Sequence, residues 1–178
     1  MDINRLKTFS APFYEGKDMM HSLWHIELVH KAVCHIIKAG KYKVDADFLM
    51  AATYFHGFIN AHEGDIRAWL SAEGFVENDI EKIITIARES IASAVPETLE
   101  GKILHDAHLI EGGKVYMVTK CLITGSLRGQ TLPETIAYVE ENILGARTCY
   151  LPETIPLIEE ASEFTRLFIA DLKAGLAR

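Results

Sequence analysis

Apolar side chains recur along most of the chain at spacings of three and four residues. This is the period of an α-helix that buries one face. In the segment 18–38 the stripe consists of Val29, Val33, Ile36 and Ile37. Gly40 follows the segment and is a typical helix terminator. No segment shows the alternation typical of a strand, so the pattern predicts an all-α fold.

The same period predicts further helices along the chain. We expect them near residues 45–55, 62–73, 78–88, 99–110, 115–122 and 136–143. Residues 1–17 are expected to form a short lead-in with one helical turn near Asn4, and residues 154–175 a closing C-terminal helix. At 178 residues the chain is predicted to be one helical domain spanning 1–178.

Three polar residues occupy positions where the helical period predicts apolar, buried side chains. His25 lies one turn before Val29, and His56 closes the uncharged run 48–55. Asp106 lies in the gap of the stripe on 99–110. A carboxylate that faces a core needs a partner, so we predict a metal site with His25, His56 and Asp106 as ligands. The alternative is two hydrogen-bonded core histidines and a capping or salt-bridged aspartate.

Other polar residues are candidates for catalysis around this site. His21 precedes His25 by four residues and shares its face, where it could contact a phosphate or hold a water. His62 and Glu63 follow His56 closely and are candidates for a base or a substitute ligand. Their alternative role is that of a helix N-terminus carrying a favourable acidic residue.

Two more histidines flank the aspartate in sequence. His105 and His108 point roughly 100° and 200° around the helix from Asp106, so the pattern does not assign them to the site.

Three motifs carry a resemblance to a known family. They are a His-x-x-x-His motif formed by His21 and His25, the stretch Tyr54-Phe55-His56-Gly57, and the stretch Glu100-Gly101-Lys102-Ile103-Leu104-His105-Asp106-Ala107. In this order they resemble the HD-domain phosphohydrolase superfamily, and the likeness extends into the C-terminal helix. The resemblance implies an HD-like helical fold with metal ligands at His25, His56 and Asp106. The aspartate of the family's His-Asp pair is Gly57 here, and Gly57→Asp is expected to tighten metal binding if the site persists.

Composition and charge exclude some classes of binding partner and indicate a cellular location. The formal charge of −7 and the pI near 5.6 argue against nucleic acid and against anionic membranes as partners. No apolar run is long enough to span a bilayer, and the N-terminus does not read as a secretory signal. The three cysteines form no Cys-x-x-Cys pair, which favours reduced thiols and a cytoplasmic location.

The function expected from these features is a metal-dependent phosphohydrolase. Its substrate would be a small phosphate ester, with nucleotides among the candidates, and its cofactor a divalent ion (Mn, Zn, Ni, Fe or Mg). Lys17 and Lys102 are candidate phosphate contacts, or else solvated surface lysines. Two alternatives remain open: a degenerate HD-like module that binds a ligand or partner without catalysis, and a non-haem iron oxygenase, which also uses two histidines and one carboxylate.

Overall fold

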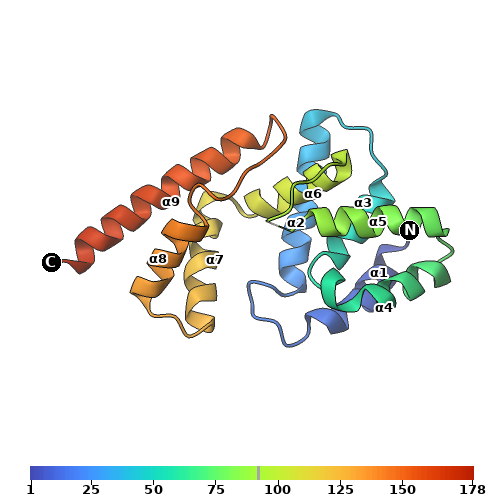
Figure 1. The fold of residues 1–178 in the computed structure, drawn as a ribbon, viewed down its shortest axis with the longest axis horizontal. Coiled ribbons are helices and arrows are strands. Elements are labelled where there is room, and N and C mark those ends of the chain that lie inside the picture. Colours follow the sequence, from blue (N-terminus) through green and yellow to red (C-terminus); the bar gives the residue numbers. More distant parts are fainter. Residues whose placement is uncertain (92) are drawn as a thin grey trace. The chain divides into compact units, whose positions relative to one another are not determined.

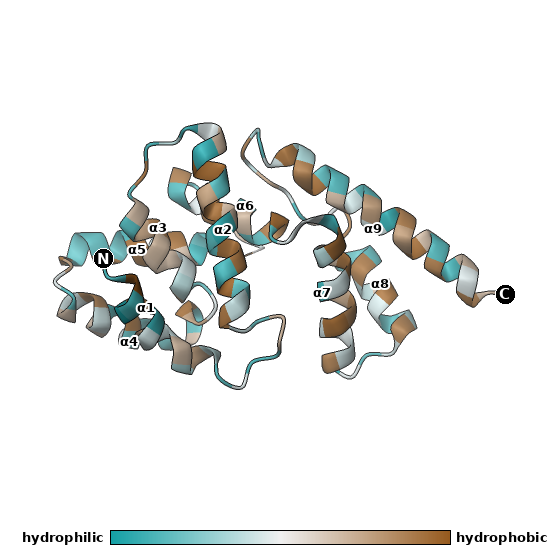
Figure 2. Cartoon of the chain, turned by 180° about the vertical axis from the view of Figure 1, so that it is seen from behind, coloured by the Kyte–Doolittle hydropathy of each residue, from teal (hydrophilic) through white to brown (hydrophobic). Residues whose placement is uncertain are grey.

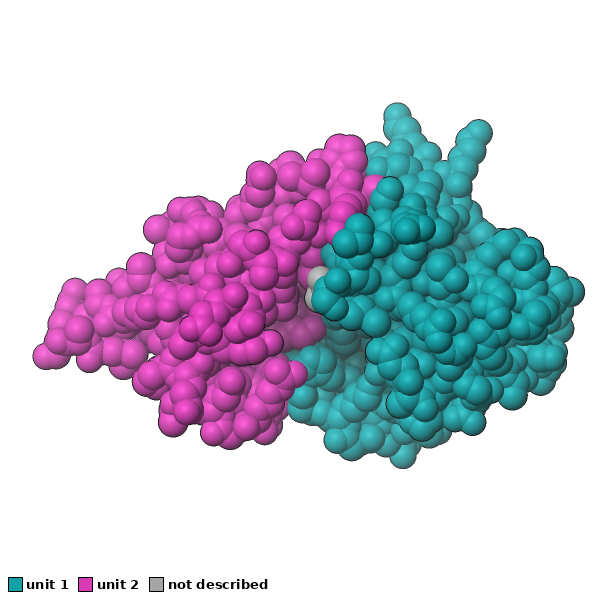
Figure 3. Space-filling view, viewed as in Figure 1, with its two compact units in different colours: residues 1–108 teal, residues 109–178 magenta. Residues whose placement is uncertain are grey.

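The computed structural model describes residues 1–91 and 93–178 (Figure 1). Nine α-helices, one short 3-10 helix and no strand occur in these residues. The predicted all-α fold is therefore confirmed. The chain divides into two compact units, residues 1–108 and residues 109–178 (Figure 3). One domain spanning 1–178 stays a prediction.

The centre of unit 1 is α3 (Ala46–Phe55), a short helix of mostly apolar residues. Unit 1 contains α1 (Ile3–Ser10), η1 (Ala11–Tyr14), α2 (Leu23–Gly40), α3, α4 (Ile59–Ala72), α5 (Glu77–Glu89) and most of α6 (Leu99–Ile110). Helices α1, α2 and α5 all pack on α3, and α4 packs on α5. Residues 51–55 of α3 are all buried, which is why this run carries no charge.

Helix α2 begins later than the apolar pattern predicts. Its first residue is Leu23, and Asp18, the first residue of the predicted segment 18–38, belongs to the preceding turn instead. There the Asp18 carboxylate accepts a hydrogen bond from the Met20 amide and pairs with the ring of His21. The expected start was wrong because the side chain satisfies a turn, an alternative open to any short acidic residue. The buried stripe of α2 nevertheless follows the predicted period.

Two other segments of unit 1 also differ from expectation. The lead-in contains a complete helix, α1, and not a single turn. Asp2 caps this helix, because its carboxylate accepts a hydrogen bond from the Asn4 amide at 2.8 Å. Helix α4 begins at Ile59, before the predicted position 62. His62 carries non-helical angles (φ −132°, ψ 30°), so the helix is kinked at the residue where we expected it to start.

Unit 2 is a group of three helices. Both α8 (Leu132–Asn142) and α9 (Ile155–Leu176) pack against α7 (Gly113–Leu127). Helix α8 opens with a capping box between Thr131 and Glu134. Helix α9 corresponds to the predicted closing helix and carries apolar and polar bands along its length (Figure 2). The core of this unit contains Leu109, Met117, Ile136, Val139, Ile143, Cys149, Ile158, Ala161 and Ile169.

Two observations bear on the predicted environment of the protein. Within the described residues, no helix combines the length and the apolar composition that a bilayer crossing requires. In the part of the chain that the structure describes, Cys34, Cys121 and Cys149 form no disulfide.

Candidate metal centre

Three histidine rings from three helical elements of unit 1 converge. His25 lies on α2, His56 at the C-terminal end of α3 and His108 on α6. Each offers one ring nitrogen, and these three atoms lie within 4.8 Å of one another. The ring centroids are 5.7 Å apart for His25 and His56, 5.4 Å for His25 and His108, and 5.0 Å for His56 and His108. Imidazole nitrogens at this spacing are a donor set suited to a transition-metal ion.

His25 reaches the cluster because it continues the buried stripe of α2. Val29 and Val33 follow on the same face, and the side chain of His25 is itself buried. A histidine here faces the core, as the sequence pattern predicts, and not the solvent.

His56 is held in a defined orientation by the backbone. Its Nδ1 lies 2.6 Å from the carbonyl oxygen of Thr53. A carbonyl only accepts, so Nδ1 must carry the hydrogen and donate it. In the neutral ring the lone pair then belongs to Nε2, so Nε2 is the nitrogen that would coordinate a metal.

His108 repeats this arrangement with a different carbonyl. Its Nδ1 lies 3.3 Å from the backbone oxygen of Ser90, which precedes it by 18 residues in the chain. By the same reasoning Nε2 is the nitrogen of His108 that would coordinate a metal. The sequence pattern did not assign His108 to the site, and the Ser90 carbonyl leaves no signature in the sequence.

Asp106, the third ligand predicted from the sequence, is fully buried on the same helix. Its Oδ1 lies 3.3 Å from Nδ1 of the buried His105. The cluster of three histidines does not include it. A role for Asp106 as a ligand stays a prediction, and the structure adds His108 as a competing third donor.

His21 lies beside the cluster, as predicted, with its ring centroid 6.1 Å from that of His25. Its Nδ1 contacts both oxygens of Asp18, at 2.9 and 2.8 Å. Burial raises the pKa of the Asp18 carboxyl, but hydrogen bonds from the His21 ring and the Met20 amide outweigh it and leave that pKa below its usual value. The charged carboxylate therefore keeps the hydrogen of His21 on Nδ1 and its lone pair on Nε2.

His62 and Glu63, the other two predicted catalytic residues, make contacts of their own. The exposed ring of His62 lies 3.1 Å from Asp65 and packs on Phe13, with centroids 4.8 Å apart. Glu63 accepts from Arg67 Nε at 2.8 Å and from Arg88 through its second oxygen. The structure thus gives both residues partners on α4, α5 and η1, and their catalytic role stays a prediction.

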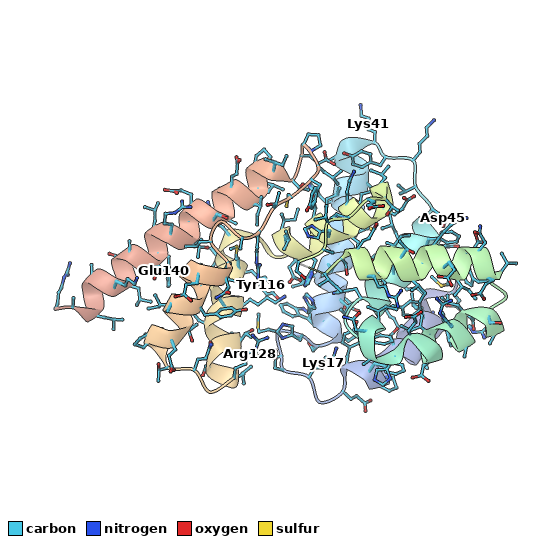
Figure 4. The ribbon with its side chains drawn as sticks, viewed as in Figure 1. Lys17, Lys41, Asp45, Tyr116, Arg128 and Glu140 are labelled. Carbon is cyan, nitrogen blue, oxygen red and sulfur yellow. The ribbon has the colours of Figure 1, made fainter. Side chains whose placement is uncertain are left out.

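Gly57, the residue after His56, is covered by the aromatic ring of Tyr14. The Tyr14 hydroxyl donates a hydrogen bond to the Tyr54 carbonyl at 2.7 Å. Lys17, labelled in Figure 4, lies in the segment between η1 and α2 and donates to the Gly57 carbonyl at 2.6 Å. Its Nζ also lies 4.6 Å from the centre of the Tyr14 ring. One of the two lysines singled out in the sequence is thereby placed next to the turn that carries His56.

Comparison with known proteins shows the fold but no family. No family model matches the chain, and no curated protein matches it significantly in sequence. The crystal structure of YpgQ from Bacillus subtilis in complex with ADP matches with a TM-score of 0.76 at 17% identity, over 97% of this chain and 93% of that one. A crystal structure from Lactobacillus plantarum matches with a TM-score of 0.79 at 14% identity, over 98% of this chain and 96% of that one. At these identities the likeness shows that the chain shares its all-helical fold with both proteins.

Proposed function

We propose that this protein is a metal-dependent phosphohydrolase of the HD type that acts on a small phosphate ester. The observation that carries the proposal is the convergence of His25, His56 and His108 in unit 1. A divalent ion held at this centre would polarise a phosphoryl oxygen and lower the pKa of a bound water. The family resemblance of the motifs and the HD-like fold of the structural neighbours support the same reaction class.

The residues around the cluster suit a phosphate substrate. Nε2 of His21, whose orientation Asp18 maintains, is available to hold a water or a phosphate oxygen. The ammonium group of Lys17 is the cation next to the His56 turn and could bind the substrate phosphate. We favour a nucleotide as the ester, because the neighbour YpgQ has been crystallised in complex with ADP.

Protein purified without a metal-affinity tag tests the proposal directly. We expect about one transition-metal ion per chain and release of inorganic phosphate from nucleoside mono-, di- or triphosphates. Hydrolysis should disappear after chelation and return when the ion is restored. The matched variant is His56→Asn, because the Asn amide can still donate to the Thr53 carbonyl while the Nε2 ligand is lost. Metal-loaded protein that hydrolyses no phosphate ester would contradict the proposal.

A second function is favoured by Gly57. With a glycine beside His56, the site lacks the carboxylate that the family resemblance places there. A module that binds a phosphorylated ligand without turnover would suit such a site. Calorimetry with ADP separates the two functions: binding without phosphate release supports the module, and binding with release supports the enzyme.

A further inference from the structure

We infer that a cavity in unit 1, separate from the three histidines, binds an organic cation: an amine or amidine attached to an aromatic or aliphatic group. The inference depends neither on the metal site nor on the proposed hydrolysis. The cavity lies among the first turns of α3, the helix α5 and the first turn of α6, and its volume is about 490 Å³. Its lining residues are Asp45 (labelled in Figure 4), Phe48, Asn78, Glu81, Lys82, Thr85, Ile86, Thr98 and Glu100.

The cavity lies at the other end of α3 and α6 from the histidine cluster. Phe48 precedes His56 by eight residues. Glu100 likewise precedes His108 by eight residues. Eight residues correspond to about 12 Å along a helix axis. The cavity and the candidate metal centre are therefore distinct sites that share two helices.

The charged side chains of the lining favour a cation. The carboxylates of Asp45, Glu81 and Glu100 face one ammonium group, that of Lys82. Glu81 pairs with Arg67 at 2.8 Å, which holds the pKa of its carboxyl below the usual value. Glu100 is half-buried, and its side chain makes no hydrogen bond or ion pair with the residues that the structure describes. A cation that enters the cavity would supply the counter-charge for Glu100.

Phe48 supplies an aromatic wall on which a cation already lies. The Nζ atom of Lys82 is 5.7 Å from the centre of the Phe48 ring. The same ammonium group pairs at 3.0 Å with Asp79, which does not line the cavity. The face of an aromatic ring attracts ammonium and guanidinium groups within about 6 Å. The surroundings of the ring thus accept a positive charge, and Lys82 would compete with a ligand for it.

A metal ion suits this cavity less well than an organic cation. The donor atoms of a metal site lie close together, and in the described residues Asp45, Glu81 and Glu100 do not form such a group. Asp45 also uses one carboxylate oxygen to cap α3, where it accepts from two backbone amides at 3.0 Å. Negative charge spread over a cavity of this size fits a larger cation, whose apolar part packs on Phe48.

Titration of the full-length chain with benzylamine and benzamidine tests the inference. We expect each to bind saturably, one per chain, and to shift the backbone amide NMR signals of Phe48, Thr85 and Thr98 while those of His56 and His108 stay in place. Benzyl alcohol, a neutral molecule of the same size as benzylamine, should bind at least about 10-fold more weakly because it lacks the charge. The inference is overturned if neither cation saturates, if the alcohol binds as tightly, or if the shifts occur at the histidines.

Variants of the lining test the role of each group, and urea unfolding checks that each variant folds. Glu100→Gln removes the charge at constant size and should weaken benzylamine binding about 10-fold. Phe48→Leu removes the ring and should weaken it about 3-fold or more. Lys82→Met removes the competing ammonium group and should tighten it. Glu97→Gln is the matched control, because its side chain is exposed and does not line the cavity.

The outcomes for two of these variants are decisive. An affinity in Glu100→Gln equal to that of the Glu97→Gln control would overturn the inference, because the counter-charge would then have no effect. Weaker binding in Lys82→Met would also overturn it, because a site for cations gains from the loss of a competing cation. Neither measurement depends on hydrolysis, so failure of the proposed function leaves this test unchanged.

Discussion

A Cβ atom at position 57 would lie 2.7 Å from the hydroxyl oxygen of Tyr14 and 2.8 Å from its Cε1. Gly57 is not among the residues with positive φ, so its backbone could accept another residue and the obstacle is this ring. The ring is buried and anchored by its hydrogen bond to the Tyr54 carbonyl. An aspartate at position 57, where the family resemblance would place one, would therefore meet the Tyr14 ring.

This contact changes the outcome expected for Gly57→Asp. We predict that the variant loses about 1–3 kcal/mol of unfolding free energy through overpacking, and that it gains no metal affinity. Gly64→Ala is the matched control, because its Cβ would meet nothing within 4 Å inside α4 and should stabilise by about 0.5–1 kcal/mol. Urea unfolding of the apoproteins measures both. An unchanged midpoint in Gly57→Asp would show that the Tyr14 ring moves aside easily.

Asp18 is predicted to set the tautomer of His21. In Asp18→Asn the amide can donate to Nδ1, so the hydrogen of the neutral ring should move to Nε2. Nitrogen-15 spectra of the imidazole report this directly, and hydrolysis should fall about 100-fold if His21 handles a proton. The prediction fails if the hydrogen moves to Nε2 and the rate stays at the parental value.

Lys17 is predicted to contact the substrate phosphate. Burial lowers the pKa of its ammonium group, and the ammonium is already positioned by the Gly57 carbonyl. Lys17→Met should raise KM about 10-fold or more, as expected for the loss of a charged hydrogen bond, and leave the affinity for the divalent metal unchanged. Lys31→Met, at an exposed position on α2, is the control. A KM equal to that of the control would exclude Lys17 from substrate binding.

Glu89 is predicted to anchor the start of α6. Its Oε1 accepts from the amides of Glu97 and Thr98, and Oε2 accepts from the Thr98 hydroxyl. Glu89→Ala should cost about 1–3 kcal/mol of unfolding free energy, because two backbone donors lose their acceptor. Since α6 carries His108, the affinity for a divalent metal should fall as well. Glu97→Ala, with an exposed side chain, controls for the loss of charge and should leave both quantities unchanged.

Glu63 is predicted to matter more for the contact between α4 and α5 than for hydrolysis. Arg67 and Arg88 occupy its two oxygens, and all three side chains are partly exposed. Glu63→Gln should lower the unfolding free energy by up to about 1 kcal/mol and change the rate only a few-fold. A folded variant without hydrolysis would instead support the catalytic role that the sequence suggests.

The helices themselves are largely readable from the sequence. Helix α2 has a buried face of Ile26, Val29, Val33 and Ile36 that carries no charged residue, so its period is clear and places His25 correctly in the core. The uncharged run of α3 likewise indicates a central helix that ends at His56. The start of α2 was misjudged because Asp18 is equally able to satisfy a helix and a turn, and local sequence does not distinguish the two.

The pattern of apolar residues is enough to predict most of the helices, the burial of His25 and the place of His56 at the end of the central helix. The third member of the cluster was decided by tertiary structure alone. Residues 103–107 of α6 are all buried, so the helix has no polar face against which one buried residue could be singled out, and Asp106 looked like the exception. The ring of His108 is oriented by its hydrogen bond to the backbone carbonyl of Ser90, which lies just after α5. Periodicity describes which face of a helix avoids water, whereas the direction of a ring depends on hydrogen-bond partners that only folding brings near.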